Sequence, residues 1–124
     1  MKRVLMALSL VACGSSEPTT IYGPPTESVC SPSSTLTYDN FGKKFMEDYC
    51  TRCHASTLSG AARQGAPSFH DFDTVQGIRP IGDHIDETTA AGPAATNTGM
   101  PEDGNKPTLA EREQLGEWLA CGAP

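Results

Sequence analysis

Aromatic and other apolar residues are scarce in this chain of 124 residues. Aromatic residues make up 6% of the sequence, with a single tryptophan, and all hydrophobic residues together make up 37%. This apolar content is low for a small domain stabilised by side-chain burial alone. Such domains are commonly stabilised further by a disulfide, a metal or a cofactor. We therefore expect a disulfide or a bound group to complete the core.

Long hydrophobic runs are also missing. The longest, residues 4–12, has nine residues, whereas a membrane-spanning helix needs about 20. Two basic residues precede this run, a pattern typical of an export signal. Leu10-Val11-Ala12-Cys13 resembles the lipobox of bacterial lipoproteins, whose cysteine is lipidated and becomes the new N-terminus; the alternative is an ordinary signal peptide. We expect residues 1–12 to be removed and Cys13 to anchor an exported protein to a membrane, in the bacterial periplasm or cell envelope.

Several classes of functional motif are absent. The sequence has no Ser-His-Asp order, no paired acid and base carboxylates and no phosphate-binding loop. Basic residues number 9 against 15 acidic ones, which excludes the basic face that nucleic-acid binding requires. The acidic residues of the middle region most simply form a solvated surface: Asp71, Asp73, Asp83, Asp86 and Glu87.

The motif that carries chemistry is Cys50-Thr51-Arg52-Cys53-His54. At this spacing each thiol can add to one vinyl group of the same porphyrin, and the adjacent imidazole can bind the iron as an axial ligand. The pentapeptide therefore predicts one covalently bound haem, held by Cys50, Cys53 and His54. An enclosed porphyrin would also supply the apolar core that the composition lacks.

Two other readings of C-x-x-C compete with haem. A tetrahedral zinc site needs two further ligands at close spacing, but His70, His84 and Cys121 form no such pair. A thioredoxin-like motif follows a strand, whereas the segment before Cys50 has a helical pattern. Both readings are therefore weaker, and a non-haem metal or disulfide module remains an alternative.

The five cysteines can all be accounted for. Cys13 is expected to be lipidated, and Cys50 and Cys53 to be bonded to haem, so that Cys30 and Cys121 remain. An exported protein can keep a disulfide between these two, and the alternative is a pair of free thiols.

The chain divides into three parts. Residues 1–12 form the signal, and residues 13–37, rich in Ser, Thr, Pro and Gly, have the composition of a flexible tether. Residues 38–124 form one domain. Its first helix is expected over residues 41–49, capped by Asp39 or Asn40, with Phe41, Phe45 and Tyr49 on one apolar face.

The last helix has the clearest boundaries. Thr108 and Glu111 have the spacing of a capping box, Leu115 and Trp118 share one face, and Cys121 with the following glycine ends the helix. Between the terminal helices, short helical pieces are expected around residues 73–78 and 82–88, separated by Gly- and Pro-rich loops. No segment alternates well enough for a strand, so the expected fold class is all-α.

These features resemble the class I c-type cytochromes, specifically a lipid-anchored bacterial member, over residues 39–122. The resemblance implies a small cytochrome c fold, in which terminal helices bracket loops around one haem. A glycine eight positions before the first cysteine, here Gly42, lets the terminal helices approach each other, although Met46 stands where the family usually has an aromatic residue. The carbonyl partner of the axial histidine would belong to Ala66 or Pro67.

The sixth iron ligand is expected to be Met100. Two of the four methionines leave with the signal, and Met46 lies one turn before Cys50 on the proximal helix. Met100 lies in a late loop and precedes Pro101, as in the family. His84 is the main rival as distal ligand, and His70 is a weaker one.

A six-coordinate haem has no open position, so we expect a one-electron carrier of a respiratory or other redox chain and not an enzyme. The alternative is a haem enzyme or gas sensor with a labile distal ligand. After removal of the signal only Lys43, Lys44 and Lys106 remain as lysines. We therefore expect a redox partner with a basic or neutral docking patch, and no nucleic acid.

Overall fold

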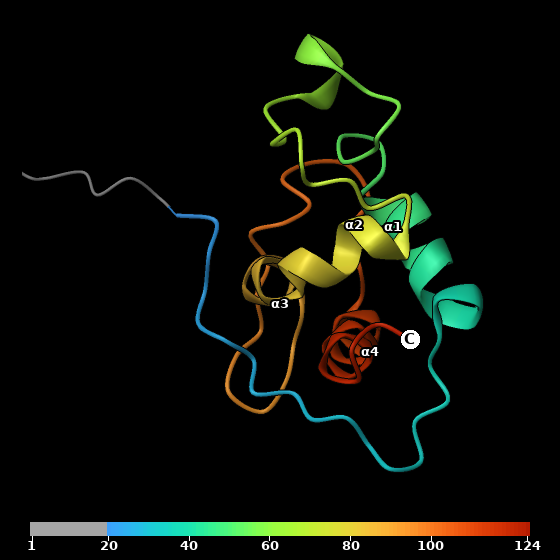
Figure 1. Cartoon of the computed structure of the whole chain (residues 1–124). Helices are drawn as coiled ribbons and strands as arrows, with labels where there is room; N and C mark the ends of the chain where they lie inside the picture. The colour runs from blue at the N-terminus through green and yellow to red at the C-terminus, as the bar shows by residue number, and fades with distance from the viewer. Residues whose placement is uncertain (1–19) are drawn as a thin grey trace, which may run out of the picture.

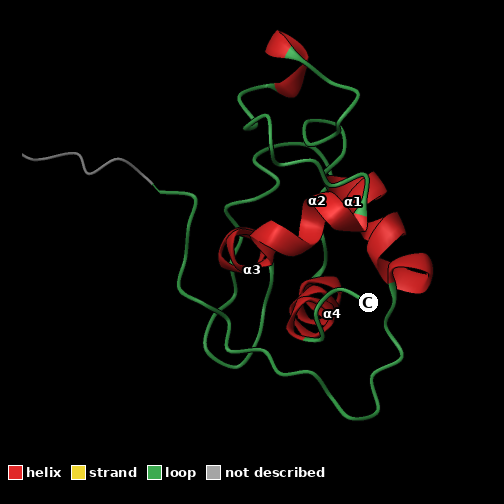
Figure 2. Cartoon of the chain, viewed as in Figure 1, coloured by secondary structure: helices red, strands yellow, loops and turns green. Residues whose placement is uncertain are grey.

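The computed structural model describes residues 20–124, and helices are the only regular elements in this range (Figures 1 and 2). One isolated bridge joins Ala91 and Thr96. The α-helices are α1 (Lys43–Tyr49), α2 (Val75–Ile78), α3 (Gly82–Thr89) and α4 (Leu109–Ala120), with a π-helical turn at Tyr38–Gly42 and 3-10 turns at Gly60–Arg63 and Arg79–Ile81. The expected all-α class is therefore confirmed for this range.

The first helical segment begins earlier than predicted. Its N-cap is Thr37, whose hydroxyl accepts from the backbone N–H of Asn40 at 3.2 Å, while the Asn40 side chain accepts from the Thr37 N–H at 2.8 Å. The expectation that Asp39 or Asn40 caps the helix is therefore wrong, because Asn40 serves as the reciprocal partner inside the first turn. The end of α1 at Tyr49 agrees with the prediction.

The predicted boundaries of α4 are confirmed. The Thr108 hydroxyl accepts from the Glu111 N–H at 3.2 Å, and the Glu111 carboxylate accepts from the Thr108 N–H at 2.7 Å. After Ala120 the chain turns at Gly122, whose φ of 86° lies in the left-handed region that glycine adopts without strain. In Figure 1, α4 is seen nearly end-on, with the other helices arranged over it.

The core gathers buried side chains from all four α-helices: Phe45 and Met46 of α1, Ile78 of α2, Ile85 of α3, and Leu115 and Trp118 of α4. A Cβ atom at Gly42, the last residue of the π-helical turn before α1, would lie only 2.3 Å from Cζ2 of Trp118, so glycine is what lets this turn approach α4 so closely. The close approach at Gly42 that the resemblance implies is therefore present.

Residues 21–30, here called the N-terminal strap, pack against the helical domain. Thr26 is fully buried: its N–H and its hydroxyl donate to the two carboxylate oxygens of Asp86 on α3, at 2.8 and 2.5 Å. The Gly23 N–H donates to the Glu87 carbonyl at 2.7 Å, and the Thr26 carbonyl accepts from the Ala94 N–H at 2.9 Å.

The strap corrects, for residues 21–30, the expectation that residues 13–37 form a flexible tether. Small and polar residues cannot build an apolar core, but here their backbone groups find hydrogen-bond partners on α3 and the loop after it. The domain therefore begins before residue 38. Residues 1–19 lie outside the described range, and with them lie the predicted signal, Cys13 and the first part of the predicted tether.

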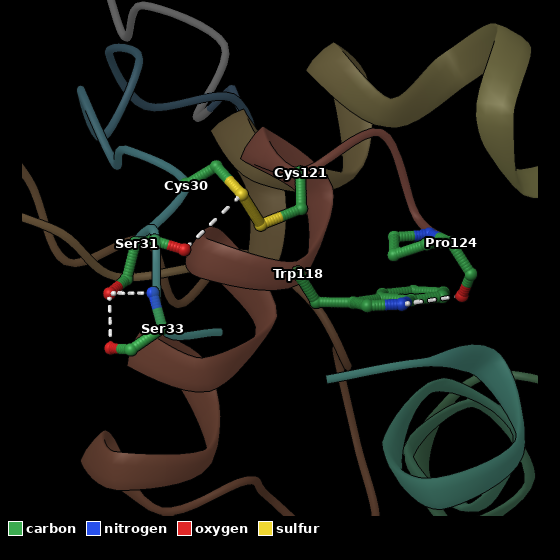
Figure 3. Close-up of a disulfide and its surroundings, with 6 residues drawn as sticks. All are labelled: Cys30, Ser31, Ser33, Trp118, Cys121 and Pro124. Carbon is green, nitrogen blue, oxygen red and sulfur yellow. Dashed lines mark hydrogen bonds between the residues drawn. A yellow bond between two sulfur atoms is a disulfide. The ribbon is translucent and has the colours of Figure 1, made fainter. Parts of the chain in front are cut away.

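A disulfide joins the end of the strap to the end of α4 (Figure 3). It links Cys30 and Cys121, the pair left over by the cysteine count, with 4.7 Å between their Cα atoms and 91 residues of sequence separation. Within residues 20–124, no helix combines the length and apolar character needed to cross a membrane.

Candidate haem site

One cavity of about 370 Å³ gathers the residues that the sequence singles out. Its volume lies within the range of small-molecule and cofactor sites, roughly 300–1,000 Å³. The predicted site residues that line it are Cys50, Cys53, His54, Pro67 and Met100. Residues separated by up to 50 positions in sequence thus meet at one concave surface.

The segment after α1 turns sharply to present its three chemical groups. The carbonyl of Cys50 accepts from the N–H groups of both Cys53, at 3.1 Å, and His54, at 3.0 Å. The two thiols are free rather than bridged to each other. Burial raises the pKa of the Cys50 thiol to about 12, so it stays neutral at physiological pH. A thiol held neutral is a poor redox nucleophile.

The imidazole of His54 is prepared to bind a metal through Nε2. Its Nδ1 lies 3.3 Å from the His70 carbonyl oxygen, which can only accept, so Nδ1 carries the proton and Nε2 keeps its lone pair. Burial lowers the pKa of His54, an effect that this hydrogen bond partly opposes. The ring also stacks on Phe72, with centroids 4.5 Å apart and planes 11° from parallel.

The carbonyl partner of His54 differs from the one that the resemblance implies. The His70 carbonyl takes that place, and the carbonyls of Ala66 and Pro67 accept from the guanidinium of Arg63. Arg63 is buried and also forms an ion pair with Asp71 at 2.8 Å. The sequence reasoning missed Arg63; its only signal is a basic residue eight positions before an acidic one in a stretch otherwise poor in charge.

The backbone of Met100 is fixed from two sides. Its N–H donates to the Thr88 carbonyl at the end of α3 at 2.8 Å. Its carbonyl accepts from Nη1 of Arg112 on α4 at 3.1 Å. Arg112 is buried, and the same nitrogen donates to the carbonyls of Thr89 and Asn97 at 2.6 and 2.8 Å. This second buried arginine, also missed from the sequence, holds the loop that carries Met100.

Both rival histidines line the same cavity. His70 is buried and His84 is exposed, and their ring centroids lie 5.7 Å apart. The strap contributes two further wall residues, Ile21 and Tyr22, and the Tyr22 ring packs edge-on against His84 with centroids 5.5 Å apart. The cavity thus offers imidazoles as well as the thioether of Met100.

One ion pair, between Arg52 and Asp103, ties the Cys50–His54 segment to the loop that carries Met100 at the edge of the cavity. Within that loop, Lys106 donates to the carbonyl of Pro101. The Arg52 and Asp103 side chains are 52% and 68% exposed, so the pair contributes little to stability but links the two segments.

The donor set has the chemistry that a covalently attached haem requires: two free thiols, an imidazole with an available lone pair and a thioether around one cavity. Among residues 20–124 no three His, Cys, Asp or Glu side chains come together as a closed zinc site would need. The fit rests on the residues alone, since comparisons with protein-family models, with curated proteins and with solved structures find no match to this chain.

Proposed function

We propose that this protein is a one-electron carrier with one covalently bound c-type haem, similar to the class I c-type cytochromes. The observation that carries the proposal is that Cys50, Cys53, His54 and Met100 all line one cavity. Cys50 and Cys53 would hold the porphyrin through thioether bonds, and His54 and Met100 would be the axial ligands.

The bound haem would supply reversible one-electron oxidation and reduction of iron. The chain contributes the ligands and their surroundings. His54 offers Nε2 while its Nδ1–H donates to the His70 carbonyl, which sets the orientation and basicity of the imidazole. A thioether ligand from Met100 favours ferrous iron and raises the reduction potential relative to a second imidazole.

The proposal extends to location and partner. The signal and lipobox at Cys13 favour an exported protein, anchored in the cell envelope of a bacterium and serving a respiratory or other redox chain. The excess of acidic residues favours a redox partner whose docking patch is basic or neutral.

Covalent attachment is tested by expression in a bacterial host that has a c-type haem maturation system. We expect the protein to retain one haem mass after denaturation and acid extraction, and Cys50→Ala combined with Cys53→Ala to abolish this retention. Cys30→Ala combined with Cys121→Ala is the matched control and should retain haem. Wild-type protein without covalent haem or a Soret band would reject the proposal.

Distal ligation is tested by carbon monoxide binding to the ferrous protein. We expect wild type to bind carbon monoxide poorly and Met100→Ala to bind it readily, because the thioether no longer fills the sixth position. Met46→Leu is the control, since Met46 is buried in the core away from the cavity lining. Ready binding of carbon monoxide by wild type would favour an enzyme or sensor instead. If substitution of His84 or His70, and not of Met100, allows carbon monoxide to bind, that histidine is the sixth ligand.

A further inference from the structure

Arg63 is the most highly bonded side chain near the cavity. It ends the turn Gly60–Arg63 in the long segment between α1 and α2, and its residue exposure is only 6%. Its guanidinium donates to the backbone carbonyls of Ala55, Leu58, Ala66, Pro67 and His70, at 2.8, 3.4, 3.1, 2.5 and 3.1 Å. The carboxylate of Asp71 completes the set at 2.8 Å.

This arrangement fixes the guanidinium in one position. All three nitrogens donate, and the planar fork reaches carbonyls on several sides at once. The ammonium group of a lysine is a single point charge with three donors, so it cannot reproduce this geometry. Arginine is therefore required here for its shape as well as its charge.

One of these carbonyls is shared with the proposed axial ligand. The His70 carbonyl oxygen accepts from Nη2 of Arg63 at 3.1 Å and from Nδ1 of His54 at 3.3 Å. A positively charged donor draws electron density from the oxygen, which weakens it as an acceptor for the second donor. The 3.3 Å distance lies just beyond the usual range of about 2.7–3.2 Å for an N–H···O bond.

We propose that Arg63 is a positioning residue that weakens the hydrogen bond from His54 to the His70 carbonyl and thereby raises the reduction potential of the haem. The inference rests on the proposed function. A weaker bond at Nδ1 leaves the imidazole less electron-rich and a poorer donor to iron, which favours the ferrous state.

The test compares Arg63→Gln and Arg63→Lys with wild type in the haem protein. Two quantities are measured: the midpoint potential, and the proton resonance of His54 Nδ1–H in the diamagnetic ferrous state. We expect both variants to lower the potential and to move the resonance downfield, because the His70 carbonyl becomes a stronger acceptor for His54. Arg79→Gln and Arg79→Lys are the controls, since exposed Arg79 also donates to a carbonyl, that of Ala123.

The lysine variant separates geometry from charge. If only the positive charge near the haem matters, Arg63→Lys keeps the wild-type potential and resonance, and the proposal is overturned. A lowered potential in Arg63→Gln with an unmoved Nδ1–H resonance would overturn it as well. Wild type that carries no covalent haem rejects the proposed function itself, and this inference with it, and the absent Soret band identifies that case.

If the Arg63 variants do not fold, Asp71→Asn tests the proposal in their place. This change keeps every donor of Arg63 but removes the negative charge beside it, so the guanidinium should polarise the His70 carbonyl more strongly. We expect the Nδ1–H resonance of His54 to move upfield and the potential to rise. An unmoved resonance in folded Asp71→Asn protein would contradict the proposal.

Discussion

At the scale of single residues, Gly42 shows how one missing side chain sets a helix contact. A Cβ atom there would lie 2.3, 2.5 and 2.9 Å from three ring atoms of Trp118. The backbone of Gly42 is ordinary right-handed helix, with φ of −58°, so the constraint comes from space and not from conformation. Trp118 is fully buried, which leaves its ring little room to retreat.

We therefore expect Gly42→Ala to lower the free energy of unfolding by about 1–3 kcal/mol, the usual cost of overpacking a core. Gly82→Ala is the matched control, because a Cβ atom there would meet only Leu119 at an ordinary 3.8 Å. The control should be neutral or stabilising by up to about 1 kcal/mol, since alanine favours helix. Denaturant unfolding of both variants checks the difference, and equal stabilities would contradict the steric argument.

At the scale of elements, the start of α4 is coupled to the end of α1. The Glu111 carboxylate caps α4 through Thr108 and accepts from the hydroxyl of Tyr49, the residue before Cys50, at 3.0 Å. The backbone N–H of Thr108 is the main reason why the pKa of Glu111 lies below its ordinary value. The same carboxylate therefore orders both the start of α4 and the end of α1, next to Cys50.

This shift predicts a pH dependence. Because the pKa of Glu111 is lower in the folded state, its contribution to stability is complete above its ordinary pKa of about 4.3 and is lost as the pH falls through the folded value. We expect Glu111→Gln to be less stable than wild type by about 0.3–1 kcal/mol at pH 7, with the difference disappearing on acidification. Glu113→Gln, an exposed change on the same helix, is the control. A difference that stays constant throughout acidification would show that charge is not the cause.

The disulfide between Cys30 and Cys121 links the strap covalently to the end of α4. In the chain-entropy model, closing a loop of 91 residues stabilises the folded state by about 4–5 kcal/mol. We expect Cys30→Ser, Cys121→Ser and the double variant to lose similar amounts of unfolding free energy, because each removes the same bond. If the double variant loses as much unfolding free energy as the two single variants added together, the two cysteines are not bonded to each other. Alkylation of both cysteines in the non-reduced protein would also contradict the disulfide.

At the scale of the whole molecule, net charge would govern how the proposed redox partner approaches. If residues 1–12 are removed as we propose, Lys2 and Arg3 leave with them, and seven basic residues remain against fifteen acidic ones, a formal charge of −8. Of the remaining lysines, Lys44 forms an ion pair with Asp48 one helical turn away. In that proposed form only Lys43, Lys44 and Lys106 remain as lysines, too few for the lysine rim with which many class I c-type cytochromes meet acidic partners.

We expect electron transfer to be faster with a basic redox partner than with an acidic one of similar potential at low salt. Added salt should slow the first reaction, because screening weakens long-range attraction beyond about 10 Å at 0.1 M ionic strength. Stopped-flow rates across ionic strength check this. A faster reaction with the acidic partner at low salt would contradict the prediction.

Local spacing was enough to single out the chemical groups of the candidate site. The positions of Cys50, Cys53 and His54 follow from one pentapeptide, Met100 follows from elimination, and the capping box at Thr108 marks the start of α4. These signals survive in a single sequence because each depends on the chemistry or geometry of residues that are close neighbours.

Only the tertiary structure decided how these groups are supported. The strap is held by bonds such as that between Thr26 and Asp86, 60 residues apart, and its composition alone is typical of a flexible tether. The acceptor for His54 is the His70 carbonyl, and the carbonyls of Ala66 and Pro67, which the resemblance implied, accept from Arg63. Backbone carbonyls are present at every residue, so the sequence carries no mark of which one a buried side chain will reach; only the folded path of the chain selects it.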